Sequence, residues 1–496
     1  MSLVGAEAET GSEMIDIAIV GAGAAGMMAA IWAGRTIAGT RSEAIGSRHD
    51  LISSDAEERP PDTVSRRNRV SIVAFDGARS LGAKILVAGG GRCNVTHDVV
   101  DAREYAGSST NAIRKVLKRF DVRETTVFFR ELGVELKRED TGKLFPVTDD
   151  ARTVLNALLN AARQAKTELR YPWRVTDVQF DPSRAAPFTI EGYRGQPRNR
   201  GGNGRGEKET VENSSDPQLI QIHAQRVVFA PGGRALPRSG SDGAGHEIIQ
   251  RLGHALTTAI FPALVPLIVD PSSDPLGVRE LAGVSTIATL DVHSGTGKRL
   301  KSVSGSTLFT HFGLSGPGPM DISRYLTDAR RADPQAMLHI NWLPELRAEA
   351  IDADLVNLGK RSVIRYVRSL RVPNADRLPE RLVMAICRAA GVEPDAVGHT
   401  LRREQRLRLV EMLTSMVMPV AGDRGWNAAE TTAGGVPLSE IHLKTMESRI
   451  TPGLYLCGEI CDVDGRIGGY NFQWAWASGY VAGIAAAKSL NRPSVN

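Results

Sequence analysis

The sequence predicts an α/β fold with a parallel sheet, interrupted by a β-rich segment and a helical segment. First, the β-branched run IDIAIV (15–20) leads directly into a glycine turn and an alanine-rich helix. Second, short β-rich pieces alternate with turns between Pro262 and Asn341. Third, apolar residues recur at helical spacing from Leu346 to Met418. The 496 residues suffice for two or three globular domains.

The composition argues against several functional classes. The chain has 61 basic and 56 acidic residues, a net charge of +5, which is a weak field for this length. The basic runs 65–69, 197–208 and 401–409 lack interleaved aromatic residues, so we expect solvated surface rather than nucleic-acid contacts. The uncharged stretch 17–34 contains glycines and follows an acidic tail, unlike a signal peptide. We therefore expect neither membrane nor nucleic acid as a partner.

The cysteines indicate the compartment. Cys93, Cys387, Cys457 and Cys461 are too few for the disulfide framework of a secreted domain. This favours a reducing compartment, the cytoplasm. The segment CGEIC (457–461) has a C-x₃-C spacing but no second pair of ligands follows it, so we expect no metal site. The sequence does not indicate the oligomeric state.

The first motif that carries chemistry follows a polar leader (1–13), which we expect to be disordered. GAGAAG (21–26) places glycines at its first, third and sixth positions, between a strand and a helix. These glycines permit a tight turn, close approach of a pyrophosphate, and packing of the helix on the strand. The motif predicts a Rossmann-like dinucleotide site made by residues Gly21, Ala22, Gly23, Ala24, Ala25 and Gly26.

The next strand ends in the acid that such a site requires. Residues 36–68 are polar and are predicted to be a surface insertion, after which VSIVAFD (70–76) ends at Asp76. This carboxylate is the candidate for the ribose hydroxyls, the alternative being an ordinary aspartate in a turn. A second polar insertion (194–217) precedes the strand RVVFAPGG (226–233).

The C-terminal region repeats the pattern of strand, acid, glycines and helix. LYLCGE ends at Glu459, which suits the hydroxyls of a sugar or ribityl chain, and GGYN opens an alanine-rich helix. A purely structural Gly-Gly turn is the alternative for GGYN. A second strand-bounded GxGxxG is lacking, so we expect one tightly bound dinucleotide, FAD, with NAD(P)H only as a transient electron donor. The residues predicted to bind FAD here are Gly458, Glu459, Gly468, Gly469, Tyr470 and Asn471.

Eight blocks in order resemble one family, the YhiN/BaiN-like FAD-dependent oxidoreductases. They are GAGAAG (21–26), GAKILVAGGGRCNVTH (82–97), GKLFPVTDDARTVLNAL (142–158), PRSGSDGAGHEIIQRLGH (237–254), PALVPL (262–267), LFTHFGLSGP (308–317), TTAGGVPLSEIHLKTMESRITPGLYLCGE (431–459) and GGYNFQWAWASG (468–479). Family members usually have Glu at Asp76, Asn at His97 and Thr at Pro231.

The resemblance implies an architecture of three parts. A Rossmann-like FAD-binding domain would come from both ends of the chain (14–250 and 436–490). A β-barrel-like domain would be inserted over 251–343, returning over 419–435, and a helical subdomain (344–418) would be nested within it.

The resemblance also implies further contacts with the cofactor. It places Lys84 and the segment Gly91, Arg92, Cys93 and Asn94 beside the flavin, the backbone of Val175 at the adenine, and Gly232 and Gly233 near the cofactor. Glycines 89–91 would let the chain lie along the ligand, with Arg92 and Asn94 as polar contacts. Cys93 then fills space, although a redox-active thiol is the alternative.

The predicted activity is that of an NAD(P)H-using flavin reductase or dehydrogenase of an apolar small molecule such as a cyclic enone. One alternative is an amine oxidase resembling aminoacetone oxidase, with oxygen as the acceptor. A more remote alternative is an RNA-associated flavoprotein. The catalytic residues are not identified by a motif, and His311 is the tentative candidate for a proton-transferring group.

Overall fold

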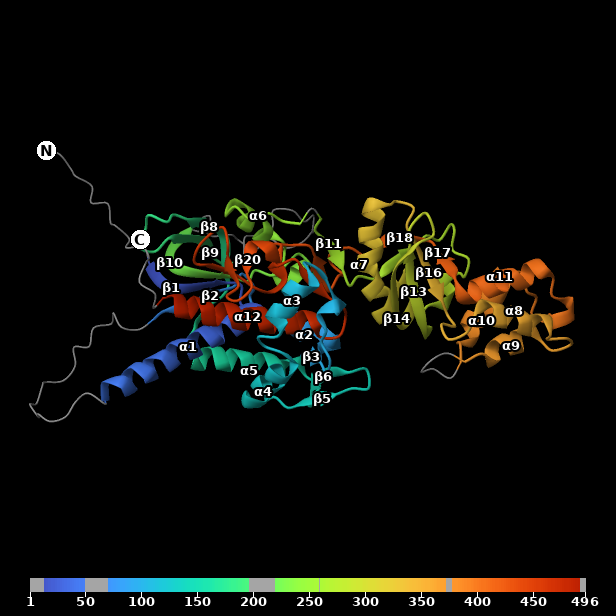
Figure 1. The fold of residues 1–496 in the computed structure, drawn as a ribbon, viewed down its shortest axis with the longest axis horizontal. Helices are drawn as coiled ribbons and strands as arrows, with labels where there is room; N and C mark the ends of the chain where they lie inside the picture. Colours follow the sequence, from blue (N-terminus) through green and yellow to red (C-terminus); the bar gives the residue numbers. More distant parts are fainter. Residues whose placement is uncertain (1–12, 50–69, 196–218, 258, 372–376, 491–496) are drawn as a thin grey trace, which may run out of the picture. The chain divides into compact units, whose positions relative to one another are not determined.

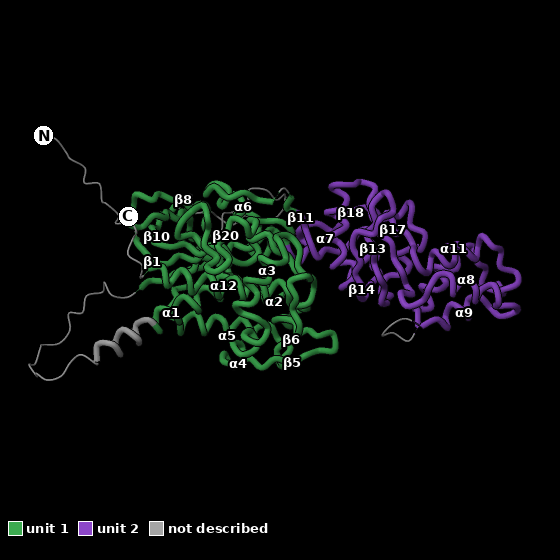
Figure 2. Tube along the Cα trace, viewed as in Figure 1, with its two compact units in different colours: residues 1–260, 432–496 green, residues 261–431 purple. Residues whose placement is uncertain are grey.

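A computed structural model describes residues 13–49, 70–195, 219–257, 259–371 and 377–490, with no account of the side chains of 40–49. The chain divides into two compact units, shown in Figure 2. Unit 1 comprises residues 1–260 and 432–496, and unit 2 comprises residues 261–431. Unit 2 is therefore inserted into the sequence of unit 1.

Unit 1 is built on a nine-stranded sheet in the order β20-β21-β22-β10-β1-β2-β7, with β9 also paired to β10 and β8 to β9. β1 pairs in parallel with β2 and β10, and β10 pairs in parallel with β22, so a strand from the C-terminal segment lies beside strands from the N-terminal one. The strands are β1 (Glu13–Val20), β2 (Ile72–Phe75), β7 (Glu168–Arg170), β8 (Trp173–Phe180), β9 (Phe188–Arg194), β10 (Ile220–Phe229), β20 (Ile441–His442), β21 (Glu447–Ser448) and β22 (Leu454–Leu456).

Two smaller sheets complete unit 1. They are β3-β6-β5 and β23-β4. Their strands are β3 (Thr96–His97), β4 (Tyr105–Gly107), β5 (Leu136–Arg138), β6 (Lys143–Pro146) and β23 (Val463–Gly465), and two further short strands, β11 (Phe261–Ala263) and β19 (Thr431–Ala433), pair with each other where the chain enters and leaves unit 2.

Helices α1 and α12 pack closely against each other in unit 1 (Figure 1). Small residues allow the approach: a Cβ on Gly479 would lie 2.4 Å from the carbonyl oxygen of Ala25, and one on Gly483 would lie 2.2 Å from that of Ala29. The helices of unit 1 are α1 (Ala24–His49), α2 (Ala83–Gly91), α3 (Thr110–Leu117), α4 (Val122–Glu131), α5 (Ala151–Gln164), α6 (Ala244–Arg251) and α12 (Tyr470–Ser489), with 3₁₀ turns η2 (Ala102–Glu104), η3 (Pro237–Ser239), η6 (Leu438–Glu440) and η7 (Gly458–Ile460).

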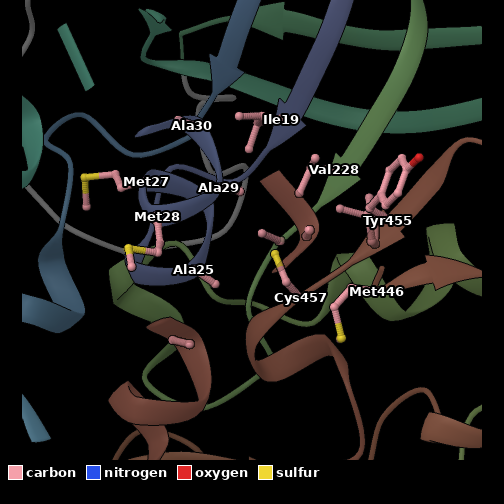
Figure 3. Packing of buried hydrophobic residues seen from close by; sticks show 14 of the residues in the cluster. Ile19, Ala25, Met27, Met28, Ala29, Ala30, Val228, Met446, Tyr455 and Cys457 are labelled. Atoms are coloured by element: carbon pink, nitrogen blue, oxygen red, sulfur yellow. The ribbon is translucent and has the colours of Figure 1, made fainter. Parts of the chain in front are cut away.

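The core of unit 1 joins the two distant parts of the chain. Figure 3 shows Ile19 of β1 and Ala25 and Ala29 of α1 in one cluster with Val228 of β10 and Cys457, which follows β22. Each of these side chains is buried. Apolar contacts therefore hold the N-terminal and C-terminal segments together around the glycine turn that follows β1.

The first predicted insertion differs from the structure at its start. Helix α1 continues to His49, whereas the sequence predicted that a surface insertion begins at residue 36. The segment after Arg35 is rich in Ser, Thr and Gly, which lowered its apparent helix propensity, but a helix already nucleated and packed extends at little further cost. The remainder of that insertion, most of the second one (194–217) and nearly all of the leader (1–13) lie outside the described residues.

Unit 2 contains a seven-stranded antiparallel sheet in the order β17-β16-β13-β14-β15-β12-β18. The strands are β12 (Leu267–Val269), β13 (Ser285–His293), β14 (Arg299–Thr310), β15 (Gly313–Ser315), β16 (Met337–Asn341), β17 (Met416–Met418) and β18 (Val420–Asp423). The helices are α7 (Pro317–Ala332), α8 (Ala348–Val356), α9 (Val363–Ser369), α10 (Glu380–Ala389) and α11 (Arg403–Thr414), with 3₁₀ turns η4 (Val278–Leu281) and η5 (Gly398–Thr400).

The apolar residues of the helical segment form part of the core of unit 2. Ile351, Leu355 and Val367, which recur at helical spacing, are at most 1% exposed. The four helices α8 to α11 occupy 348–414 and β17 then rejoins the sheet. The boundaries of unit 2 fall at 261 and 431, whereas the predicted insert runs from 251 to 435.

Candidate functional site

The glycine turn after β1 combines tight packing with one open position. Gly21 has φ +91°, and a Cβ there would lie 2.2 Å from the carbonyl oxygen of Ala230. A Cβ on Gly26 would lie 1.9 Å from the carbonyl oxygen of Gly21, whereas one on Gly23 would meet nothing within 4 Å. Gly21 and Gly26 are thus required by the protein's own backbone. Gly23 faces open space at the start of α1, where helix N–H groups favour a phosphate.

Asp76 is connected to this turn. One of its carboxylate oxygens, Oδ2, accepts the N–H of Ala22 at 2.9 Å, and Oδ1 accepts the N–H of Ala78 at 2.8 Å. Burial raises the pKa of the Asp76 carboxyl, and the two N–H donors and the charge of Arg174 oppose that rise. A carboxylate has about four acceptor sites, so two remain for ligand hydroxyls. Asp76 therefore fixes the turn, in addition to its predicted contact with the ribose.

A second glycine turn lies at the C-terminal end of α2. Within α2 the backbone leaves helical geometry at Ala88, and positive φ values follow at Gly89 (58°), Gly90 (70°) and Gly91 (86°). A Cβ on Gly90 would meet no atom within 4 Å, and one on Gly91 only an ordinary contact at 3.8 Å. Both glycines therefore leave space for a neighbour that lies flat against the backbone.

Cys93 lies inside the protein rather than on this surface. Its side chain has no exposed area, its backbone adopts φ +59°, and its N–H donates to the carbonyl of Ala88 at 2.9 Å. Burial raises the pKa of the Cys93 thiol to about 12. A thiol with this pKa carries almost no thiolate at neutral pH, which favours the space-filling interpretation.

Arg92 and Asn94 have different surroundings. Nη1 of Arg92 donates to Glu139 at 2.6 Å, and its guanidinium lies 4.1 Å from the centroid of the Phe145 ring. Asn94 is 8% exposed, and its Oδ1 is buried without a hydrogen-bond partner. An unpaired buried acceptor costs about 1–3 kcal/mol, which a donor on a bound ligand would recover. Asn94 therefore fits a contact with a cofactor, whereas Arg92 is engaged with the protein's own side chains.

Lys84, Gly233 and Glu459 meet although they are far apart in the sequence. Nζ of Lys84 donates to Oε2 of Glu459 at 2.6 Å. Oε1 of Glu459 accepts the N–H of Thr432 at 2.9 Å. A Cβ on Gly233 would lie 2.3 Å from Oγ1 of Thr432 and 2.7 Å from Oε1 of Glu459. The structure thus places the predicted acid, the predicted lysine and one predicted glycine in a single cluster.

Sequence reasoning missed Thr432. Its Oγ1 accepts the N–H groups of Arg234 and Ala235 at 2.8 and 3.0 Å, so this side chain fixes the backbone after Gly233. The signal was available, because Thr432 lies in the block TTAGG that resembles the family, but a lone threonine before glycines has no distinctive spacing.

Three residues of the GGYN segment that were predicted to contact FAD make contacts with other residues of the protein. Asn471 accepts the N–H of Gly465 at 2.8 Å and donates to its carbonyl at 2.9 Å. The hydroxyl of Tyr470 donates to the carbonyl of Val99 at 3.1 Å. A Cβ on Gly469 would lie 2.6 Å from the carbonyl carbon of Thr96. These contacts support the alternative of a structural turn for the three residues.

The remaining predicted residues are distributed over both units. Val175 is 8% exposed on β8, Gly232 adopts φ +80° beside Ser241, and Gly458 adopts φ +76° next to Ala25. Gly468, with φ +117°, lies near His97 and Lys143. His311 belongs to unit 2, on the exposed turn between β14 and β15, where its ring contacts Phe312 at 5.1 Å between centroids. All other predicted site residues belong to unit 1.

The four cysteines of the chain are all described, buried and free. Burial raises the pKa of Cys387 and Cys457 to about 12, and that of Cys461 well above its ordinary value. No group of His, Cys, Asp and Glu suited to a metal occurs among the described residues. In the same part of the chain, no helix is long and apolar enough to cross a membrane.

Comparison with known proteins gives a family match over most of the chain. The model of the HI0933-like protein Rossmann domain matches residues 63–196 and 204–485. The 3-dehydro-bile acid delta(4,6)-reductase of Clostridium scindens is 29% identical over 478 residues, which is 95% of this chain and 99% of that protein. The ribosomal RNA dihydrouridine synthase of Escherichia coli is 29% identical over 481 residues, 96% of this chain and 100% of that protein.

A solved structure, the 3-ketosteroid-delta4-(5alpha)-dehydrogenase of Rhodococcus jostii, aligns with a TM-score of 0.42 at 15% identity, covering 96% of this chain and 97% of that one. The residues around the two glycine turns agree with the family match, because their open glycines and the unpaired Asn94 acceptor fit a flat dinucleotide ligand. The chain belongs to the HI0933-like Rossmann family, the YhiN/BaiN-like FAD-dependent oxidoreductases that its sequence resembles.

Proposed function

We propose that the protein is an NAD(P)H-using flavin reductase that saturates a C=C bond conjugated to a carbonyl group in an apolar small molecule. The supporting observation is the burial of all four thiols, each with a raised pKa. A dithiol relay needs an accessible thiolate, so electrons would pass between the flavin and its two substrates directly. FAD, when bound, would accept a hydride from NAD(P)H and deliver it to the substrate.

The names of the similar proteins support the bond type. A 3-dehydro bile acid has a ketone, and its delta(4) bond is conjugated with it. In uridine the bond that is reduced to give dihydrouridine is also conjugated to a carbonyl. A hydride added to the far carbon of such a bond, with a proton added to the near carbon, consumes one NAD(P)H and one proton and releases NAD(P)⁺.

The residues of unit 1 would bind and orient the cofactor. Gly23 and the start of α1 would hold the pyrophosphate, and Gly90 and Gly91 would lie along the ring. Oδ1 of Asn94 would accept a hydrogen bond from the cofactor. Lys84 would hold the carboxylate of Glu459 in place, so that its free lone pairs accept hydroxyl groups.

Spectroscopy of the purified protein tests this proposal. Under anaerobic conditions, NADPH or NADH should bleach the flavin absorbance, and a 3-oxo-4-ene steroid should restore it. The saturated 3-oxo steroid is the matched control and should restore nothing. A flavin that stays oxidised with both nucleotides but bleaches with a primary amine would replace this proposal with the amine oxidase.

Ribosomal RNA is the second candidate substrate, favoured by the equal similarity to the E. coli dihydrouridine synthase. The weak net charge of +5 and the lack of aromatic residues among the basic runs favour the small molecule. Mass spectrometry of ribosomal RNA from a strain that lacks the gene distinguishes the two. Loss of a dihydrouridine in that strain, restored by the wild-type gene, would establish the RNA substrate.

His311 is proposed as the proton-transferring group of the reaction. It is exposed on the turn between β14 and β15 of unit 2, and an imidazole ring can both donate and accept a proton. His311→Ala should leave flavin reduction by NADPH unchanged and slow the reoxidation by substrate at least about tenfold. Unchanged turnover in this variant would remove His311 from the mechanism.

A further inference from the structure

A histidine that the sequence analysis did not single out lies against the cofactor-binding segments. His246 is the third residue of α6 and is 6% exposed. The residue before it packs on the loop after β10, because a Cβ on Gly245 would lie 2.4 Å from Cγ of Pro231. The N–H of Gly243 donates to the carbonyl of Gly233 at 3.1 Å. The start of α6 is therefore held directly against residues 231–233.

One nitrogen of the His246 ring is buried and unpaired. Nε2 has no hydrogen-bond partner. Burial lowers the pKa of His246, which favours the neutral ring. A neutral imidazole with its proton on Nδ1 presents a bare lone pair at Nε2.

The position of His246 links it to the Glu459 end of the site. Gly243, three residues before His246, donates its N–H to the carbonyl of Gly233, and a Cβ on Gly233 would lie 2.7 Å from Oε1 of Glu459. The carboxylate of Glu459 also acts on the His246 ring electrostatically. The start of α6 therefore lies on the side of the site where Glu459 is expected to meet the ribityl chain.

We propose that Nε2 of His246 accepts a hydrogen bond from a hydroxyl group of the ribityl chain of FAD. The ribityl chain carries hydroxyl groups on successive carbons, so neighbouring hydroxyls can reach two acceptors side by side, here Glu459 and His246. This inference depends on the family's cofactor and not on the proposed substrate. Its test measures binding alone and is independent of turnover.

Titration of the full-length protein, stripped of flavin, with FAD measures the contact through flavin fluorescence. His246→Phe removes the acceptor and should raise the Kd for FAD about tenfold, which corresponds to 1.4 kcal/mol. His246→Gln places an amide oxygen within reach of the same hydroxyl and should stay within about threefold of wild type. His246→Leu, a smaller apolar variant, should behave as His246→Phe does.

ADP identifies which part of the cofactor is involved. ADP carries the adenosine and the pyrophosphate but no ribityl chain, so its Kd should be the same for wild type and His246→Phe. An equal weakening of ADP and FAD binding would overturn the proposal, because the contact would then be on the adenosine side. Unchanged FAD affinity in both apolar variants would also overturn it and would assign Nε2 to a bound water.

His254 provides the matched control. It is 3% exposed, and its ring nitrogens are both paired, with Glu440 and Ser448 at 2.8 Å each. His254→Phe should lower the melting temperature of the flavin-free protein and leave the Kd for FAD unchanged. His246→Phe should show the opposite pattern, since removing an unpaired buried acceptor does not destabilise the flavin-free fold. A purely structural role for His246 would make the two variants behave alike.

Discussion

At the scale of single residues, Cys93 combines complete burial with a left-handed backbone. Its thiol has a pKa raised to about 12 and so stays protonated at neutral pH. We expect Cys93→Ala to lower the free energy of unfolding by about 1 kcal/mol, as for a small cavity. The variant should keep bound flavin, its absorbance spectrum and its reduction by NADPH. Loss of flavin reduction in a variant that still holds flavin would show that the thiol takes part in the chemistry.

The pH dependence of stability follows from His254. Burial lowers the pKa of this histidine, and the carboxylate of Glu440 opposes that only in part. The folded state then binds fewer protons than the unfolded state, so stability falls as the pH drops from about 6.5, the unfolded value, toward the lowered folded value. The melting temperature should therefore fall more steeply in this window for wild type than for His254→Gln. Equal slopes would contradict the assignment.

Glu459 is the residue on which the predicted ribityl end of the site depends. Its two oxygens accept from Lys84 and Thr432. Glu459→Gln keeps the shape but removes the charge opposite Lys84, and we expect the Kd for FAD to rise about tenfold. Titration of the flavin-free variant measures this, with Glu447→Gln, on the neighbouring strand β21, as a control for a general loss of stability. An unchanged Kd would exclude a contact between this carboxylate and the cofactor.

At the scale of elements, the contact between α1 and α12 depends on glycine. A Cβ on Gly483 would lie 2.2 Å from the carbonyl oxygen of Ala29, so the helices would have to move apart. We expect Gly483→Ala to reduce the free energy of unfolding by about 1–3 kcal/mol. Gly39→Ala is the matched control, because its Cβ would meet nothing within 4 Å. That exposed change should stabilise α1 by about 0.5–1 kcal/mol, and thermal melting compares the two.

The elements that the sequence predicted best are those whose structure is determined by residues close together in the sequence. The run IDIAIV and the glycines at 21, 23 and 26 define β1, its turn and the start of α1 within twelve residues. The end of α1 at His49 was not predictable in this way, because Ser, Thr and Gly weaken the helical pattern there. Local pattern therefore located the starts of elements better than their ends.

The candidate site was less predictable than the fold because its contacts are not local. Lys84 and Glu459 are 375 residues apart, and no spacing rule connects them. That Nε2 of His246 is buried without a partner depends on how α6 packs, and this is visible only in three dimensions. Conversely, the side chain of Asn471, predicted to face the cofactor, is satisfied by Gly465.

At the scale of the whole molecule, the two units have separate hydrophobic cores, and every predicted cofactor residue lies in unit 1. A ligand that binds only the native form of one unit stabilises that unit by mass action. Calorimetry should therefore show two unfolding transitions, of which FAD raises only one. Limited proteolysis of samples heated between the transitions should identify the protected fragments as parts of unit 1. A single transition, shifted as a whole by FAD, would show that the units unfold together.

The pairing of β22 with β10, and the packing of α12 on α1, also set an order of events during synthesis. Residues 261–431 leave the ribosome before β22 and α12 do, so the inserted unit has its complete sequence first. The N-terminal strands must wait for the last part of the chain, with the edge of β10 and one face of α1 uncovered in the meantime. A nascent chain in this state exposes the apolar surface that chaperones bind, and it can acquire its flavin only after translation is nearly complete.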